Sequence, residues 1–573
     1  MKERTTRTVV IGSGCAGLNA ADWLAALGEK DFMLVTENML SGTSRNTGSD
    51  KQTYYKLSLA GDEGDSVGSL AATLKREDVD GDIALCEAAG SAQCFFKLVQ
   101  LGVPFPVSGM GEYVGYQTDH DERRRATSAG PLTSRYMTEA LEKSVRSRGV
   151  TILNHTFAYR ILADDNGVCG IQCLNTADRS FFTIRCAHII LATGGPAAIY
   201  RDRVYPKSQL GMSGMAFEIG ATGANLDCWQ YGLASVKFRW NVSGSYQQAL
   251  PRYVSVDADG QEYDFLPESM SLSDMLNNTF LKGYQWPYDP RKRNGSSRMD
   301  ILVKAEGDKD RRVYLDYRRN PTGYSLDALS EEARRYLVNC GATQDTPMDR
   351  LRAMNAPAVE LYKANGIDLG AEMLEIRVCA QHHNGGIAVD SNWQTSIPGL
   401  YACGEAAGTF GQYRPGGTAL NSTQVGSMRA AMHIAKRSGR IIADAAPAVG
   451  PPMLPAGGAE ALIAELQACM TRHAAFERDE NGIRRLLSRL DEIEGNVIPA
   501  SLHDPQLIQR LRLRDIVLTL RQVLSAMLYA LHDTEPGILE TCQGQSSRRP
   551  AHPLPERDLW FERVWQRYRN EMA

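Results

Sequence analysis

What the sequence lacks removes several classes of function. The chain of 573 residues contains no apolar run of about 18 residues, the length that a membrane-spanning helix needs. Its 12 cysteines are scattered, and none falls in a C-x-x-C or C-x-x-C-H pattern, so we expect this chain to hold neither an iron–sulfur cluster nor a c-type haem. The net charge of −4 gives no basic surplus for nucleic acid, and we predict neither a nucleic-acid partner nor a metal site.

The N-terminus and the cysteines bear on the cell compartment. The chain begins MKERTTR and passes directly into an apolar run, which leaves no room for a signal peptide. Several cysteines, such as Cys186, Cys379 and Cys403, lie within apolar runs and are expected to be reduced thiols. We therefore expect a cytoplasmic protein.

The first 37 residues contain a strand, a glycine-rich turn, a helix and a second strand in succession. A β-branched run at 8–11 precedes the turn, an alanine- and leucine-rich helical pattern covers 18–27, and a second apolar run at 32–35 ends just before Glu37. An acidic residue 20 positions after the last glycine completes a pattern typical of dinucleotide-binding units.

The turn residues have distinct physical roles in such a unit. Gly12 permits a tight turn, Gly14 lets the backbone approach a pyrophosphate, and Gly17 lets helix and strand pack closely. The start of the helix offers free N–H groups to phosphates, and Glu37 can accept hydrogen bonds from ribose hydroxyls. A glycine-rich turn with no ligand is the alternative. The residues predicted to bind the cofactor here are Gly12, Ser13, Gly14, Cys15, Ala16, Gly17 and Glu37.

The middle of the chain changes pattern at about residue 206. Before it, amphipathic helices are predicted at 82–101 and 132–148, and strands between 150 and 190 with a hairpin at Asp165-Asn166-Gly167. From 206 to 370 the α/β rhythm is lost, and the section 229–289 is rich in aromatic residues, which indicates an inserted domain.

The α/β pattern returns after residue 370 and ends before a Pro/Gly/Ala linker at 446–458. Arg414-Pro415-Gly416-Gly417 precedes a second helix start, whose dipole would favour the negative pole of a reduced flavin. These breaks predict domains at 1–205, 206–370, 371–445 and 446–573, the last of them helical.

The motifs in this order resemble the flavoprotein subunits of succinate dehydrogenases and fumarate reductases, a family that includes L-aspartate oxidase and the adenylylsulfate reductase α subunit. The resemblance is carried by GSGCAG at 12–17, ATGG at 192–195, HHNGGI at 382–387, and YACGEAAG with RPGGTALNS at 401–422. It implies an α/β fold with a Rossmann-like FAD-binding domain split in sequence, an inserted α+β capping domain and a C-terminal helical domain.

The resemblance also implies FAD and places more residues around it. In the membrane-bound members a histidine near the loop 44–49 carries the flavin covalently, whereas this chain has Arg45-Asn46-Thr47, so FAD is expected to be non-covalent. The additional residues implied as cofactor-binding are Ser44, Asn46, Thr47, Thr193, Gly194, Gly404, Glu405, Thr418, Ala419 and Leu420.

The active-site part of the resemblance is incomplete. Arg414 matches the arginine that binds the substrate carboxylate, and Arg298 matches the proton-transfer arginine, one residue out of register. One family histidine is missing, because the chain reads Trp229-Gln230-Tyr231-Gly232-Leu233, and the second position is Gln381. His382 or His383 is therefore the candidate replacement, and Tyr231 is a candidate hydrogen-bond or proton donor.

Three functions follow from these residues. The first is an FAD-dependent oxidoreductase that moves hydride between flavin N5 and a small organic acid other than succinate. The second is oxidation of an alcohol, sugar or cyclic substrate under the aromatic cap, and the third is an electron-transfer subunit without a substrate of its own. Since no haem or cluster is encoded, electrons must pass to or from a separate iron–sulfur partner, a flavin or nicotinamide reductant, or oxygen.

Overall fold

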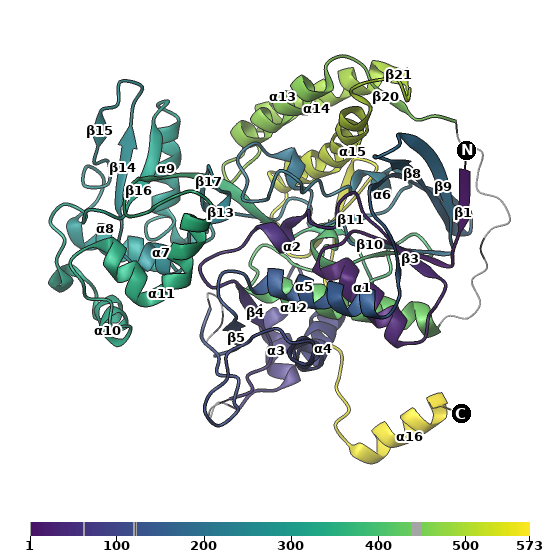
Figure 1. Cartoon of the computed structure of the whole chain (residues 1–573), viewed down its shortest axis with the longest axis horizontal. Helices are drawn as coiled ribbons and strands as arrows, with labels where there is room; N and C mark the ends of the chain where they lie inside the picture. Colours follow the sequence, from purple (N-terminus) through teal and green to yellow (C-terminus); the bar gives the residue numbers. More distant parts are fainter. Residues whose placement is uncertain are drawn as a thin grey trace.

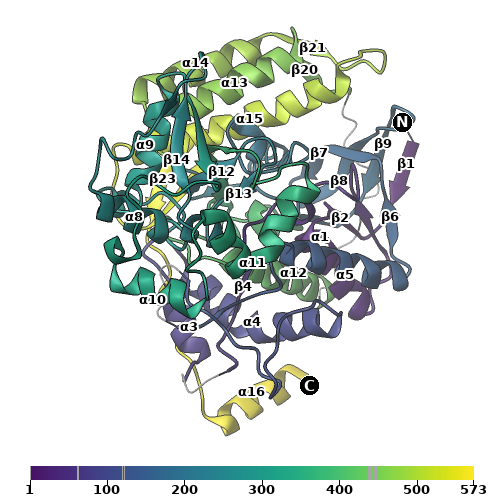
Figure 2. The same ribbon diagram turned by 60° about the vertical axis from the view of Figure 1, so that its left-hand side comes forward.

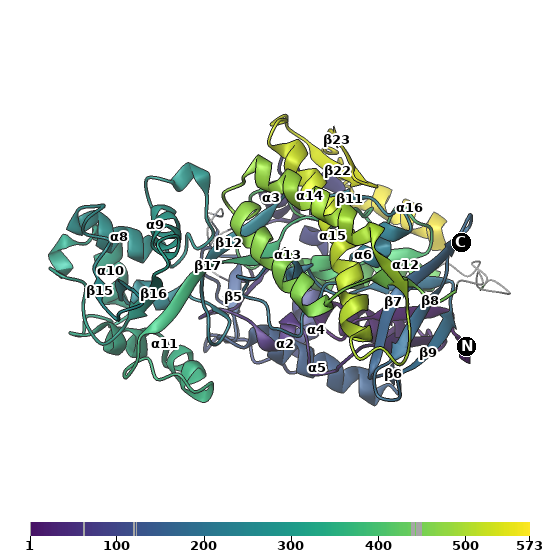
Figure 3. The ribbon, with the colours of Figure 1, turned by 90° about the horizontal axis from the view of Figure 1, so that it is seen from above.

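The computed structural model describes residues 2–60, 64–118, 121, 123–436, 442 and 450–572. Figure 1 shows a large body that carries both termini and, at its left, a separate lobe in teal and green. Two long strands join the lobe to the body, as Figure 3 shows.

A five-stranded parallel sheet forms the centre of the body. Its order is β19-β10-β2-β3-β6, and every neighbouring pair runs parallel. The strands are short, and most of their side chains are buried because helices cover the sheet. This confirms the predicted α/β unit at the start of the chain. The elements are β2 (Thr8–Ile11), α1 (Cys15–Ala26), β3 (Phe32–Val35), β6 (Thr151–Leu153), β10 (His188–Leu191) and β19 (Leu400–Ala402).

A second sheet of the body has the order β1-β9-β8-β7. Its strands β7 and β8 pair antiparallel, and Asp164 lies opposite Gly167, which confirms the predicted hairpin. Gly167 has a φ of 110°, a value that suits glycine in a tight turn. The strands are β1 (Lys2–Thr5), β7 (Thr156–Asp164), β8 (Gly167–Asn175) and β9 (Ser180–Arg185).

The helices of the body pack around α1. Both α5 and the long helix α12 contact α1, and α4 contacts α12 in turn. The predicted amphipathic stretches at 82–101 and 132–148 are confirmed as α4 and α5. The elements are α2 (Thr43–Asn46), β4 (Thr53–Tyr55), α3 (Val67–Leu74), α4 (Gly81–Gln100), β5 (Ala126–Ser128), α5 (Thr133–Ser147), α6 (Gly214–Glu218) and α12 (Thr418–Lys436).

The outer lobe is built on a six-stranded sheet of order β13-β12-β17-β16-β14-β15. Strands β12 and β17 are antiparallel neighbours. Apolar residues from Leu233 in β12 to Ile376 in β17, and from the segment of sequence between these strands, form a second hydrophobic core. The lobe lies in front of the body in Figure 2. Its elements are β12 (Trp229–Ser235), β13 (Trp240–Asn241), α7 (Ser245–Gln248), β14 (Arg252–Val256), β15 (Glu262–Tyr263), α8 (Leu272–Leu281), α9 (Arg298–Gly307), β16 (Arg312–Asp316), α10 (Glu331–Asn339), α11 (Pro347–Ala364) and β17 (Leu374–His383).

Three helices and a hairpin follow in the C-terminal part. The helices α13, α14 and α15 pack on one another above the body, and the hairpin β22-β23 extends a small sheet with β11 and β18. The elements are β11 (Gly223–Ala224), β18 (Gly386–Ile387), β20 (Met453–Pro455), α13 (Ala459–His473), α14 (Glu480–Gly495), β21 (Val497–Pro499), α15 (Leu507–Ala530), β22 (Ile538–Cys542), β23 (Gln545–Arg549) and α16 (Phe561–Met572).

Helix α16 stands away from the body at the lower right of Figure 1. Every residue from 561 to 570 is exposed, including the stacked rings of Phe561 and Trp565. The extended segment before it does pack, because the carbonyl of His552 accepts a hydrogen bond from the Gly81 amide.

Among the described residues, no helix combines the length and the apolar character that crossing a bilayer requires. The predicted cytoplasmic location and the domain boundaries at 205/206 and 370/371 stay predictions. The boundary at 445/446 and part of the predicted linker lie outside the described residues.

Candidate active site

A large cavity of about 1350 Å³ lies where the predicted cofactor residues converge. It runs from the glycine turn after β2 to the side chains of the outer lobe, so both parts of the molecule line it. Besides the turn after β2, the loop 41–53, the turn after β10 and the start of α12 contribute to its wall.

The glycine turn has the geometry that a dinucleotide needs. A Cβ on Gly12 would lie 2.3 Å from the Ala192 carbonyl oxygen, and one on Gly17 would lie 1.9 Å from the carbonyl oxygen of Gly12. These two glycines therefore allow the turn and the helix to pack. A Cβ on Gly14 would meet only the Ser44 hydroxyl, at 3.2 Å, so Gly14 leaves its space to the cavity.

The start of α1 is left available for an anion. No side chain caps the helix at Gly14. Of its first amides, that of Cys15 donates to the Ser44 hydroxyl over 3.2 Å. A helix N-terminus with uncapped N–H groups favours a phosphate.

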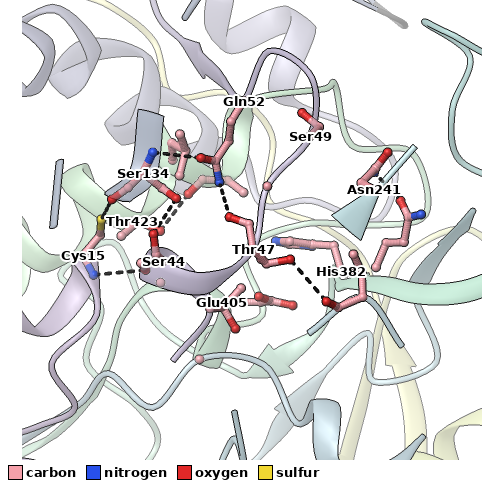
Figure 4. Close-up of a pocket in the computed structure, with 18 of the residues that line it drawn as sticks. Cys15, Ser44, Thr47, Ser49, Gln52, Ser134, Asn241, His382, Glu405 and Thr423 are labelled. Carbon is pink, nitrogen blue, oxygen red and sulfur yellow. Dashed lines mark hydrogen bonds between the residues drawn. The ribbon is translucent and has the colours of Figure 1, made fainter. Parts of the chain in front are cut away.

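The loop 41–53 is fastened to the helix starts on both sides (Figure 4). The Ser134 amide donates to Gln52 Oε1 over 2.8 Å, and the Ser134 hydroxyl donates to the Ser44 carbonyl oxygen over 2.7 Å. Gln52 in turn donates to the carbonyl oxygen of Thr47 over 3.3 Å. Because these bonds fix the loop, Ser44 and Thr47 are held at the cavity wall.

Two threonine hydroxyls on the cavity wall have no hydrogen-bond partner among the residues that the structure describes. Thr43 Oγ1 and Thr193 Oγ1 are buried and unsatisfied. Glu37 lies on the same wall, and one of its carboxylate oxygens accepts from Arg512 over 2.6 Å. Buried hydroxyls without a partner at a cavity wall are expected to pair with a bound group.

Glu405 lies at the other end of the predicted cofactor site. One carboxylate oxygen accepts from the His383 amide over 2.8 Å and from the Tyr205 hydroxyl. Burial raises the pKa of Glu405 to about 7, against the lowering effect of these bonds and of Arg414.

The structure brings most of the predicted cofactor residues to one wall. Gly17, Asn46 and Thr418 are the exceptions. Gly17 serves packing, Asn46 donates to the carbonyl oxygens of Leu40 and Gly42, and the Thr418 hydroxyl donates to the Pro415 carbonyl oxygen over 2.8 Å. The residues that line the cavity are Gly12, Ser13, Gly14, Cys15, Ala16, Glu37, Ser44, Thr47, Thr193, Gly194, Gly404, Glu405, Ala419 and Leu420.

These features fit FAD. An elongated cavity, a glycine turn with an uncapped helix start at one end and a second helix start at the other match a dinucleotide with a ring system. No histidine lies in the loop 41–53, the place where a covalent tether is known in the resembling family.

Arg414 lies on the cavity wall and has only neutral partners. Nη2 and Nε donate to Gln230 Oε1 over 2.6 and 3.1 Å, and Nη1 lies 3.3 Å from the Thr418 hydroxyl. No carboxylate of the described residues comes within ion-pair distance of this guanidinium, which is 5% exposed. Burial lowers the pKa of Arg414 to about 10, although Glu405 and Glu87 act in the opposite sense.

His382 also lies on the wall, and Asn384 fixes its ring. The Asn384 amide nitrogen donates to the Gly411 carbonyl oxygen over 2.8 Å, so its oxygen faces His382 Nδ1 at 3.0 Å. Nδ1 therefore carries the proton in this arrangement, and Nε2 is left as an acceptor. Burial first, and Arg414 second, lower the pKa of His382 well below its ordinary value, so the imidazole is neutral.

The other three predicted catalytic residues lie outside the cavity lining. His383 stacks on Trp229 with ring centroids 4.1 Å apart, and its Nε2 lies 3.1 Å from the Leu226 carbonyl oxygen. The Tyr231 hydroxyl pairs with Tyr200 over 2.9 Å. Arg298 begins α9, and its guanidinium donates to the carbonyl oxygen of Ser269. Their catalytic roles stay predictions without support from this geometry.

Two residues of the site were not predicted. Gln230 holds Arg414, and Asn384 holds both His382 and Arg414, whose Nε lies 3.3 Å from the Asn384 oxygen. Both stand beside predicted positions in the sequence, Gln230 next to Tyr231 and Asn384 next to His383. Amides carry no charge signal, so only their place within these motifs could have indicated them.

Comparisons with known proteins show the family of the chain. A family model described as an FAD binding domain matches residues 7–420. L-aspartate oxidase of Agrobacterium fabrum is 26% identical over 515 residues, which cover 87% of this chain and 86% of that protein. L-aspartate oxidase of Mesorhizobium japonicum is 28% identical over 413 residues, which cover 70% and 69%.

Solved structures show the same fold at low identity. A chain of quinol fumarate reductase from E. coli superposes with a TM-score of 0.72 at 17% identity, covering 97% of this chain and 98% of that one. The Sdh1 chain of Mycobacterium smegmatis gives a TM-score of 0.71 at 18% identity, covering 97% and 96%.

Proposed function

The chain belongs to the family of FAD-binding domains and is an FAD-dependent oxidoreductase, and from this premise we propose that it oxidises a small carboxylate other than succinate. In this proposal Arg414 binds the substrate carboxylate and His382 removes a proton while hydride leaves the neighbouring atom. The L-aspartate oxidases among the relatives are consistent with a carboxylate substrate and with oxidation.

The observation that carries the proposal is the unbalanced charge of Arg414. A buried guanidinium is costly unless an anion is close to it. The described residues offer Arg414 only neutral oxygens as hydrogen-bond partners, and Glu405 and Glu87 act on it from beyond ion-pair distance. Its position on the cavity wall leaves the missing anion to a ligand. A substrate carboxylate would form charge-assisted hydrogen bonds there.

His382 supports the oxidative direction. Because its imidazole is neutral, Nε2 is ready to accept a proton, and Asn384 holds the ring in the required tautomer. The positive imidazolium that results would lie near Arg414. A substrate carboxylate bound to Arg414 offsets this repulsion, so a carboxylate is needed both for binding and for proton removal.

The step balances as a dehydrogenation. FAD supplies a two-electron hydride acceptor when it is bound in the cavity. The substrate loses a C–H bond with its electron pair and, from the adjacent atom, a proton that passes to His382 Nε2, which leaves a double bond in the product. The family histidine expected in the motif at 229–233 is absent, which argues against succinate itself. Electrons then leave to a separate acceptor.

Direct titration of the FAD-containing protein tests this proposal. Carboxylates and neutral alcohols or sugars are added to the anaerobic protein, and the visible flavin spectrum reports binding and reduction. We expect carboxylates alone to bind, Arg414→Gln to weaken their binding roughly 10- to 100-fold, and His382→Gln to slow reduction with little change in binding.

Matched controls separate the site from general damage. Arg135→Gln removes an exposed arginine from α5, and His503→Gln removes an exposed histidine, and both variants should titrate as the parent does. If alcohols or sugars bleach the flavin and Arg414→Gln has no effect, the second predicted function replaces this one. If no compound reduces the flavin and Arg414→Gln changes nothing, the protein is an electron-transfer subunit.

A further inference from the structure

We propose that the substrate of this site is a carboxylate that carries a flat ring, with the ring bound against an aromatic wall contributed by the outer lobe. The aromatic wall consists of Phe280, Tyr284, Trp286 and Tyr336. This inference rests on the proposed function, since it assumes that Arg414 binds the carboxylate, and it names the part of the substrate that Arg414 does not reach.

All four rings of the aromatic wall line the same cavity as Arg414 and His382. Phe280 packs edge-to-face against Tyr336, with centroids 5.4 Å apart, and against Tyr284, with centroids 6.2 Å apart. Tyr284, Trp286 and Tyr336 are each only partly buried. Phe280 belongs to the hydrophobic core of the lobe, and Tyr284 and Tyr336 pack against that core. The lobe core therefore holds these rings in place at the cavity lining.

The aromatic wall begins beside the loop of Arg414. A Cβ on Gly416, two residues after Arg414, would lie 3.7 Å from the indole nitrogen of Trp286. No side-chain hydrogen bond of Trp286 is found within the part of the chain that the structure describes. A ligand held by Arg414 thus has an aromatic surface and an available N–H donor within a short distance.

The cavity lining has few positive charges that could bind a second carboxylate. Among the described residues that line the cavity, the cationic side chains are Arg414 and Lys51. Lys51 lies in the loop 41–53 and is partly exposed. His382, which also lines the cavity, has a lowered pKa and is neutral. A four-carbon dicarboxylate with a charge at each end would leave the aromatic wall uncovered.

Partly exposed rings in a cavity favour a flat apolar ligand. Water beside the rings is released when a ring stacks on them, and edge-to-face or offset contacts add roughly 0.5–1.5 kcal/mol beyond the area term, which is up to about tenfold in affinity. The same rings gain nothing from a short, fully charged acid. We therefore expect these aromatic side chains to make the site bind a ring-bearing carboxylate more tightly than a short dicarboxylate.

Two enoates that carry either a phenyl ring or a second carboxylate at the same position test the inference. Cinnamate and fumarate are titrated into the FAD-containing protein, and the dissociation constant is read from the shift of the flavin spectrum, which needs no turnover. We expect cinnamate to bind at least tenfold tighter. Trp286→Ala and Tyr336→Ala should each weaken cinnamate binding roughly threefold to tenfold and leave fumarate binding unchanged.

Tyr568→Ala, which removes an exposed tyrosine ring from α16, is the matched control and should change neither constant. Fumarate binding equal to or tighter than cinnamate, with both insensitive to Trp286 and Tyr336, would overturn the inference. Arg414→Gln keeps the two proposals apart. If Arg414→Gln weakens the binding of both acids and the parent binds cinnamate no tighter than fumarate, only the ring inference fails. If Arg414→Gln weakens the binding of neither acid, the proposed function fails.

Discussion

Arg414 and Gln230 form a close pair in which a buried guanidinium faces a neutral amide, with Nη2 only 2.6 Å from Gln230 Oε1. A glutamate at position 230 would fit the same space and would satisfy the charge from within the protein. The chain has the amide instead, which keeps Arg414 in place without neutralising it. The pair is therefore suited to receive an anion from outside.

Gln230→Glu should convert this site into a closed ion pair. The new carboxylate would compete with the substrate for Arg414, so we expect carboxylate binding to weaken roughly 10- to 100-fold while FAD stays bound. Titration followed by the flavin spectrum measures the effect. Gln261→Glu adds the same charge at an exposed position and should leave binding as it is. Unchanged binding in Gln230→Glu would show that Arg414 does not receive the substrate.

Two glycines of the first turn should respond differently to alanine. A Cβ on Gly14 meets only the Ser44 hydroxyl, so Gly14→Ala should fold but hinder the approach of the phosphates and weaken FAD binding roughly 10- to 100-fold. Gly17→Ala places its methyl 1.9 Å from the Gly12 carbonyl oxygen and should lower stability itself.

Absorbance at the flavin band and the thermal midpoint separate these two effects. Gly109→Ala is the control, because its Cβ would meet nothing within 4 Å. A Gly14→Ala protein with full FAD content would contradict the assignment of this turn to the phosphates.

Local sequence patterns predicted the elements of the body well, because these elements form from residues that are neighbours in the sequence. Strand–turn–helix units such as 8–35 and the hairpin after Asp164 depend on neighbours in sequence, and the structure confirms both. The catalytic residues depend on contacts across long separations, such as that between Gln230 and Arg414. A one-residue displacement in a motif, as at Gln381 and His382, cannot be resolved without those contacts.

Strand alternation explains which histidine reaches the cavity. His382 and His383 are consecutive in β17, so their side chains point to opposite faces of the sheet. His382 faces the cavity and His383 stacks on Trp229, which lies opposite it in β12. The sequence showed two adjacent candidates, and the choice between them required the register of β12 with β17.

Glu87 should make the protein less stable as the pH rises. This buried residue of α4 has a pKa raised to about 7 by burial, from an ordinary value of 4.5. The folded state therefore favours the protonated form, and its contribution is fully present below pH 4.5 and is lost as the pH rises through 7. The shift corresponds to about 3 kcal/mol.

Glu87→Gln removes this dependence. We expect the variant to have a higher thermal midpoint than the parent at pH 8 and a similar one at pH 5, measured on the FAD-containing protein. Glu139→Gln, at an exposed position of α5, should follow the parent at both values. A parallel pH dependence in Glu87→Gln and the parent would show that Glu87 ionises without cost.

The C-terminal segment should divide into a part that stabilises the body and a part that does not. Between residues 550 and 558 the chain contacts the body at several points, although most of these residues are exposed. The Gly81 amide donates to the His552 carbonyl oxygen, the His552 amide donates to Asp80 over 2.8 Å, and Pro553 lies where a Cβ on Gly81 would be. Truncation after 549 should lower the thermal midpoint by roughly 2 °C or more.

Truncation after 558 removes exposed side chains and should leave both the midpoint and the flavin absorbance unchanged, since exposed residues contribute little to stability. An equal loss in both truncations would mean that α16 packs on the body in solution, contrary to its exposure here.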